Sequence, residues 1–187
     1  MLSVIVTAEG NEHAAVATLA SLVPAAAAGV VRHVILVDRS GGEAIAQLAD
    51  IAGCGYLAAR GSRVEALAAG AAQARSPWLL FLTAGAILDP GWIDEASQFV
   101  QGVAASGVER AGIFRPARSP HARKGWRDWP SAFSRILGRP SPNQGLLIAR
   151  DHYERLGGYR AGVPEMRLLR RLGRGSRTRL RSRMVVL

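Results

Sequence analysis

Short apolar runs alternate with helix-like stretches along the first half of the chain. The run from Trp78 to Leu82 is five consecutive apolar residues, a pattern typical of a strand that is buried on both faces of a parallel sheet. Strands are predicted over residues 3–7, 33–37, 55–58 and 78–82, and helices over residues 12–22, 43–52, 64–74 and 90–103. This alternation predicts an α/β fold, a mostly parallel sheet with helices on both faces.

The second half is less regular. Strands are predicted over residues 112–115 and 145–149, short helices over 150–156 and 165–172, and a long loop over 116–142. The chain then ends in an arginine-rich tail with an apolar, strand-like tetrapeptide. We find no internal repeat or low-complexity linker, so residues 1–187 are predicted to form one domain, with halves at 1–107 and 108–187.

The segment from Thr83 to Asp89 follows the fourth predicted strand. Ligands of open α/β sheets bind where loops leave the carboxyl ends of strands, so this segment is the expected place for chemistry. Before Asp89, however, its only polar side chain is the hydroxyl of Thr83. Asp89 stands before Pro-Gly, where an aspartate more often begins a helix than binds a ligand. Asp38, which ends the second strand, is a better candidate for ligand contact.

Charge is distributed unevenly along the chain. Residues 1–107 contain five arginines and nine acidic residues, a net charge of −4, whereas residues 108–187 carry +14. The basic half predicts an anionic partner, either phosphate groups, an anionic membrane surface or nucleic acid, although arginine-rich codon usage would give the same excess. No known nucleic-acid-binding motif is present, which makes nucleic acid the weakest of these partners.

Targeting signals and cysteine content bear on the compartment. No apolar run approaches the ~20 residues that a membrane span requires. The N-terminus has no basic region like that of a signal peptide, and the single cysteine, Cys54, excludes a disulfide framework. We therefore expect a cytoplasmic protein, with a peripheral position at the inner membrane as an extension suggested by the basic half.

Five blocks of sequence resemble a known family. SVIVTAEGNE, HVILVDRSGG, ARGSRVEALAAGAAQARSPWLLFL, DPGW and NQGLLIARDHYERLGGY stand in the order found in family 2 glycosyltransferases of the GT-A fold, specifically their short, soluble bacterial branch. The resemblance covers nearly the whole chain. It implies a nucleotide-diphosphate-sugar site at the carboxyl ends of the first strands, with the acceptor recognised by the second half.

Individual residues carry this resemblance into the predicted site. Glu9, Asp38, Arg60 and Arg63 match positions that lie beside the nucleotide in the family. Glu165 falls on the late Glu-Asp pair whose aspartate is the usual general base, which makes it the candidate catalytic residue. Each of three residues also has a purely structural interpretation. Asp38 could cap the following loop, Arg63 could be a solvated residue in the first turn of a helix, and Glu165 could be an ordinary carboxylate at a helix N-terminus.

Other positions depart from the family pattern. The metal-binding DxD falls on Thr83-Ala84-Gly85, so the motif is degenerate and both carboxylates are missing. Mg²⁺ and Mn²⁺ prefer carboxylate oxygens, and we therefore expect no metal site there. On the acceptor side, Asn143 replaces the aspartate of the family's GDQG sequence, while Gln144 and the following glycine are retained.

Two functions are compatible with these residues. The first is a glycosyltransferase that binds a nucleotide-sugar and transfers the sugar through a metal-independent or impaired site. The second is a catalytically silent protein that keeps the GT-A fold and binds a nucleotide or serves as a scaffold. The donor sugar and the acceptor are not encoded in any motif that we recognise.

Overall fold

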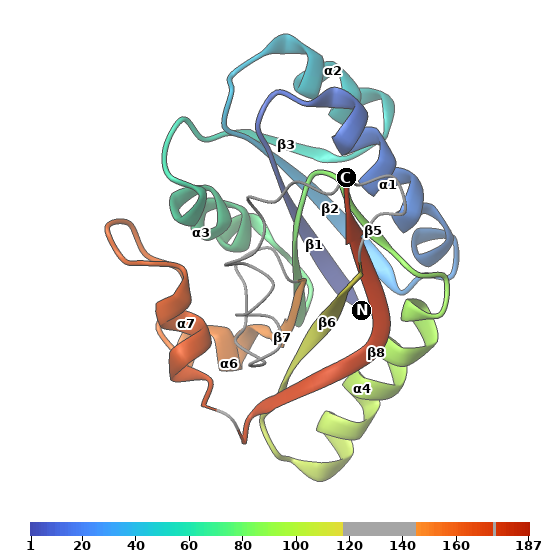
Figure 1. The fold of residues 1–187 in the computed structure, drawn as a ribbon, viewed down its shortest axis with the longest axis vertical. Coiled ribbons are helices and arrows are strands. Elements are labelled where there is room, and N and C mark those ends of the chain that lie inside the picture. Colours follow the sequence, from blue (N-terminus) through green and yellow to red (C-terminus); the bar gives the residue numbers. More distant parts are fainter. Residues whose placement is uncertain (118–144, 174) are drawn as a thin grey trace, which may run out of the picture.

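The computed structural model describes residues 1–117, 145–173 and 175–187 (Figure 1). The strands are β1 (Leu2–Ala8), β2 (Val31–Asp38), β3 (Gly55–Ala58), β4 (Trp78–Thr83), β5 (Ala86–Leu88), β6 (Ala111–Ala117), β7 (Leu146–Ala149) and β8 (Arg177–Val186). The helices are α1 (Glu12–Ala27), α2 (Glu43–Ile51), α3 (Arg63–Gln73), α4 (Trp92–Ser106), α6 (Arg150–Arg155) and α7 (Met166–Arg171).

All eight described strands belong to one sheet, in the order β3-β2-β1-β4-β7-β6-β8-β5. The first four strands in this order are parallel to one another, as the strand–helix alternation predicts. β7 then pairs antiparallel with β4, and β6 pairs antiparallel with β7 and parallel with β8. The second half of the chain therefore extends the sheet of the first half.

Helices cover both faces of this sheet (Figure 1). α1, α2 and α4 contribute to a core cluster on one face, and α3, α6 and α7 contribute to a cluster on the other. In β1, Val4 and Val6 belong to the first cluster whereas Ile5 belongs to the second. Alternate side chains of a strand point to opposite faces of the sheet, so a wholly apolar strand contributes side chains to the cores on both faces.

Pro24 does not end the first helix, contrary to the prediction from sequence. The helix continues to Ala27 with Pro24 inside it. Proline costs the helix one backbone hydrogen bond, but the following turn buries Ala25 completely and packs it in the same core cluster as Leu22. The N–H of Ala28 also donates to the carbonyl of Pro24, at 3.0 Å. Burial of this turn against the core thus stabilises the helix beyond Pro24.

The segment after β4 is not wholly a loop, which is a second correction. Residues 86–88 form β5, and they pair antiparallel with β8 from the arginine-rich tail. Their pairing partner lies about a hundred residues later in the chain, which local sequence patterns do not reveal. The tail itself is a ten-residue strand, rather than a strand-like tetrapeptide alone.

The remaining predicted elements occur close to the expected positions. The predicted loop over residues 116–142 begins with the last two residues of β6, and its remainder lies outside the described residues. Within the described part of the chain, no helix has the combined length and apolar character needed to cross a membrane.

Two glycines in helices predict opposite responses to the same substitution. A Cβ added at Gly70, in α3, would lie 2.5 Å from Ile5 Cγ2 and 2.9 Å from Val37 Cγ2, whereas one at Gly102, in α4, would meet no atom within 4 Å. Gly70→Ala is expected to destabilise the protein by about 1–2 kcal/mol, because overpacking exceeds the gain in helix propensity. Gly102→Ala is expected to stabilise it by up to ~1 kcal/mol. Urea denaturation measures both, and equal shifts in the same direction would contradict this packing.

Candidate functional site

The carboxyl ends of the four parallel strands lie at one edge of the sheet. The register pairs Ala8 with Asp38, Asp38 with Ala58, and Thr7 with Thr83. The loops that leave these strands carry the residues that the sequence predicts for nucleotide binding. The fold therefore brings the predicted residues of the first half to one place, as expected for an open α/β sheet.

Asp38 is completely buried and already accepts three hydrogen bonds. Its Oδ1 accepts from the backbone N–H of Ser40 at 2.8 Å and from the Ser40 hydroxyl at 2.6 Å. The Tyr56 hydroxyl donates to its Oδ2 at 3.3 Å. The carboxylate therefore holds the loop after β2, and a ligand reaches it only if Tyr56 or Ser40 moves aside.

Arg39 connects the loops after β1, β2 and β3. It forms an ion pair with Glu9 and donates from Nε to the carbonyl of Gly61 at 3.1 Å. Glu9 is 66% exposed, so this pair lies at the surface of the site. Arg60 packs against Gly41, where a Cβ would lie 2.6 Å from its Nε. Sequence reasoning missed Arg39, although its position directly after Asp38 at a strand end could have indicated it.

Arg63 lies at the carboxyl end of β4, where it contacts Thr83. It is the first residue of α3, and a capping box between Ser62 and Glu65 fixes the start of that helix. Its Nη1 donates to both carboxylate oxygens of Glu165, at 2.6 Å each. Its Nη2 donates to the Thr83 hydroxyl at 2.7 Å. One guanidinium thus links the predicted base to Thr83, the last residue of β4.

Glu165 lies in a largely enclosed position just before α7. Its side chain is 11% exposed and that of Arg63 is 19% exposed, so the pair is shielded from most of the solvent. Burial raises the pKa of Glu165, while the charge and hydrogen bonds of Arg63 act in the opposite direction. Burial, with a contribution from the Glu165 charge, also raises the pKa of Tyr159 strongly, so this hydroxyl remains protonated at neutral pH.

The residues at the end of β4 do not fit a divalent metal. The Thr83 hydroxyl accepts a hydrogen bond from a cation, and the backbone N–H of Gly85 donates to Ala14 O and Thr18 Oγ1, both at 2.9 Å. No group of three or more potential His, Cys, Asp or Glu ligands occurs among the described residues. A guanidinium next to the only side-chain oxygen of this segment repels Mg²⁺ or Mn²⁺ instead of holding it.

Asp89 has a structural contact. Its Oδ2 accepts the backbone N–H of Arg183 at 3.1 Å, and its own N–H donates to Arg183 O at 3.0 Å. Glu95, in the first turn of α4, accepts the N–H groups of Arg181 and Ser182, at 2.5 and 2.7 Å. Burial opposes but does not outweigh these hydrogen bonds, which lower the pKa of Glu95. Both carboxylates therefore attach β8 to the segment around the start of α4.

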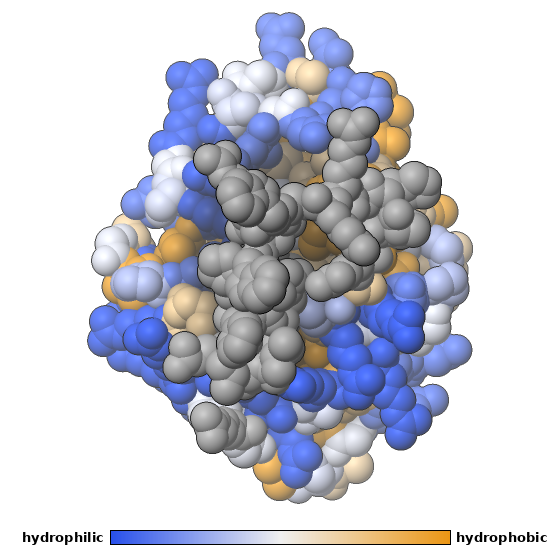
Figure 2. Space-filling model, viewed as in Figure 1, coloured by the Kyte–Doolittle hydropathy of each residue, from blue (hydrophilic) through white to orange (hydrophobic). Residues whose placement is uncertain are grey.

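The acceptor-side residues Asn143 and Gln144 lie outside the described residues. Arginines of the basic tail take two positions: α7 carries Arg167, Arg170 and Arg171, and β8 exposes Arg179, Arg181 and Arg183 at alternate positions. On the face of the molecule drawn in Figure 2, hydrophilic side chains gather over the region where β8 and α4 lie. Position 174 is outside the described residues.

The chain was compared with known proteins by sequence and by structure, and only the structures match. No protein-family model matches the chain, and no curated protein sequence matches it significantly. Solved structures do match. TarS from S. aureus (residues 1–349) has a TM-score of 0.67 at 14% identity, over 99% of this chain and 57% of the TarS chain. Glucosyl-3-phosphoglycerate synthase from Mycobacterium tuberculosis, in complex with phosphoglyceric acid, has a TM-score of 0.67 at 17% identity, over 100% of this chain and 70% of that chain.

Both proteins also match in nucleotide complexes. TarS matches in its complexes with UDP and UDP-GlcNAc, and the synthase matches in a complex with Mn²⁺, UDP and glucosyl-3-phosphoglycerate. This chain spans little more than half of the TarS chain. At these identities the likeness establishes the fold: the chain has the single-domain GT-A architecture of glycosyltransferases.

Proposed function

We propose that this protein binds a nucleotide-diphosphate sugar at the carboxyl edge of the sheet and transfers the sugar without a bound metal. The observation that carries the proposal is the contact of Arg63 with both Thr83 and Glu165. It places a permanent positive charge where the resemblance to family 2 glycosyltransferases leads one to expect a metal-binding carboxylate pair.

A guanidinium can take over the electrostatic part of a metal's work. The departing diphosphate needs positive charge near its oxygens, and arginine supplies this charge through forked hydrogen bonds to phosphate. Arg63 is positioned at the end of β4 by a helix start and by two side-chain partners, and binding of a diphosphate would exchange its contact with Glu165 for phosphate oxygens. Solved structures of the same fold in complex with UDP support the binding of a nucleoside diphosphate by this protein.

Glu165 is the proposed general base. Inverting transfer requires a group that accepts the proton of the acceptor hydroxyl as this hydroxyl attacks the sugar. Burial raises the pKa of Glu165, which makes its carboxylate a stronger base than an exposed glutamate. Arg63 keeps the carboxylate oriented, and release of Arg63 toward the diphosphate would free Glu165 for the proton.

A catalytically silent binding protein is the second candidate. Arg63 contacts both oxygens of Glu165, and an engaged carboxylate is a poor proton acceptor as long as the pair persists. In this case the same edge binds the nucleotide but no transfer follows. Under either proposal, the exposed arginines of β8 would attract an anionic surface, such as a membrane, to the protein.

Asp38 provides the first test of the nucleotide site. Asp38→Ala removes the acceptor of three hydrogen bonds and is expected to weaken binding of UDP, and to lower the free energy of unfolding, by about 1–3 kcal/mol each. Tyr56→Phe removes only the hydroxyl that covers Oδ2 and is expected to retain UDP affinity. Calorimetry and urea denaturation measure the two effects. Unchanged UDP affinity in Asp38→Ala would remove Asp38 from the site.

Arg63 provides the test of metal independence. UDP affinity is expected to change less than about twofold when Mn²⁺ is added, because the nearest donor oxygens face a guanidinium. Arg63→Gln is expected to weaken UDP binding at least about tenfold, and Arg63→Lys less, because lysine retains the charge without the fork. Arg32→Gln, an exposed arginine at the start of β2, is the matched charge control. A strong Mn²⁺ requirement in the unmutated protein would refute this site.

Glu165 provides the test of catalysis. If transfer occurs, its rate should fall as the pH decreases through the raised pKa of Glu165, because only the ionised carboxylate accepts a proton. Glu165→Gln should abolish UDP release from the sugar nucleotide while UDP still binds. Coupled detection of UDP over a series of pH values makes this measurement. Full activity in Glu165→Gln would exclude Glu165 as the base, and no activity in either protein would favour the silent binder.

A further inference from the structure

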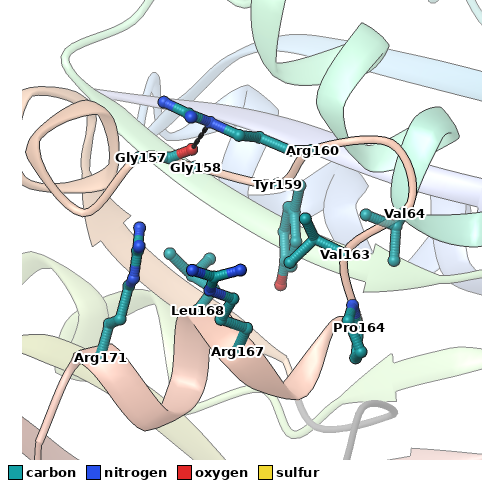
Figure 3. Close-up of a pocket in the computed structure, with 10 residues that line it drawn as sticks. All are labelled: Val64, Gly157, Gly158, Tyr159, Arg160, Val163, Pro164, Arg167, Leu168 and Arg171. Carbon is teal, nitrogen blue, oxygen red and sulfur yellow. Dashed lines mark hydrogen bonds between the residues drawn. The ribbon is translucent and has the colours of Figure 1, made fainter.

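A second basic feature lies beside the site, in a hollow of about 90 Å³ (Figure 3). The hollow is bounded by the first turn of α3, the segment after α6 and the helix α7. Its lining consists of Val64, Gly157, Gly158, Tyr159, Arg160, Val163, Pro164, Arg167, Leu168 and Arg171. Three of these ten residues are arginines and none is acidic, so the hollow combines positive charge with an apolar floor.

Two of the arginines are fixed by the backbone. Arg160 donates from Nε to Gly157 O at 2.8 Å, and Arg171 donates from Nη1 to Leu156 O at 2.7 Å. They approach the same glycine: a Cβ at Gly157 would lie 2.8 Å from Arg171 Nη1 and 3.4 Å from Arg160 Nη2. The φ of Gly157 is +83°, a conformation that also favours glycine. The chain thus keeps two guanidinium groups close together.

No carboxylate compensates these charges within the described residues. The four ion pairs found there involve other basic residues, and Glu165, which follows the lining residue Pro164, is paired with Arg63. Arg167 extends from α7 toward the same hollow and makes no side-chain hydrogen bond or ion pair to any described residue (Figure 3). Like charges held together by backbone contacts favour the binding of an anion between them.

We propose that this hollow binds a phosphate group of a ligand, held by Arg160, Arg167 and Arg171. Guanidinium groups bind phosphate through paired hydrogen bonds, and Arg160 and Arg171 each use only one of their five N–H donors on the backbone. The volume of about 90 Å³ is several times what one water molecule needs, which leaves room for a phosphate group. The apolar side chains of Val64, Val163 and Leu168 accept the carbon atoms next to that phosphate.

The position of the hollow gives this phosphate a role. Its lining includes the residues adjacent to Arg63 and Glu165, namely Val64 and Pro164. A ligand held there by its phosphate would present its other end to the proposed base. This step rests on the proposed function, and it makes the acceptor a phosphate-bearing molecule, either a soluble phosphomonoester or a lipid with a phosphate headgroup.

The test measures phosphate binding separately from nucleotide binding. Calorimetry of the full chain with glycerol phosphate, and with glycerol as the uncharged counterpart, should show binding of the phosphate only. Arg167→Gln should weaken this binding at least about tenfold, the effect of losing one charged contact. Arg179→Gln, an exposed arginine of β8, removes the same charge elsewhere and should change the affinity less than about twofold. Absence of phosphate binding, or equal losses in both variants, would overturn the site.

Vesicles distinguish the source of the phosphate. Binding of phosphatidic acid vesicles that Arg167→Gln reduces and Arg32→Gln does not would identify a lipid headgroup in this hollow. Glycerol phosphate binding without vesicle binding would identify a soluble ligand. UDP affinity should be the same in Arg167→Gln and in the unmutated protein, and competition between UDP and glycerol phosphate would overturn a separate site. If the unmutated protein binds glycerol phosphate but does not bind UDP, the proposed function is refuted and the phosphate site stands.

Discussion

The structure depends on parallel pairing of four strands, of which β1 and β4 are buried on both faces. β1 lies between β2 and β4, and its residues alternate between two core clusters. Strands of this kind need helices on both sides, and each connection must return the chain to the same end of the sheet. The carboxyl ends of β1 to β4 are therefore neighbours. The candidate site is a consequence of this topology, because its polar residues occupy the loops that the parallel strands force together.

The Arg63 contacts show how the second half completes that edge. Glu165 lies 102 residues after Arg63, yet its two oxygens accept from the same guanidinium nitrogen. The guanidinium also reaches Thr83, so the start of α3, the end of β4 and the region before α7 meet at one cation. An ion pair with this little exposure is costly to desolvate, and a shielded pair of this kind at a strand edge marks a candidate functional site.

Positive charge in the second half has two separate arrangements. The exposed arginines of β8 occupy alternate positions along the strand and form a solvated surface suited to general attraction of anions. The arginines around Gly157 surround a hollow, and two of them are held by backbone carbonyls. Both arrangements are positively charged. The backbone contacts of Arg160 and Arg171 hold the second one in a defined geometry, and the proposed selectivity for phosphate rests on that geometry.

The sequence by itself determined the α/β class, the positions of most elements and some of the polar residues at the strand ends, such as Asp38, but not the role of Arg39. Apolar runs and caps are local signals, and the resemblance to GT-A glycosyltransferases rests on short blocks such as HVILVDRSGG. Only the tertiary structure decided the remainder. Helix α1 continues past Pro24 because Ala25 is buried, and residues 86–88 become a strand because β8 pairs with them. The Arg63–Glu165 pair and the hollow beside it likewise join segments that are distant in the chain, and local patterns contain no information about such contacts.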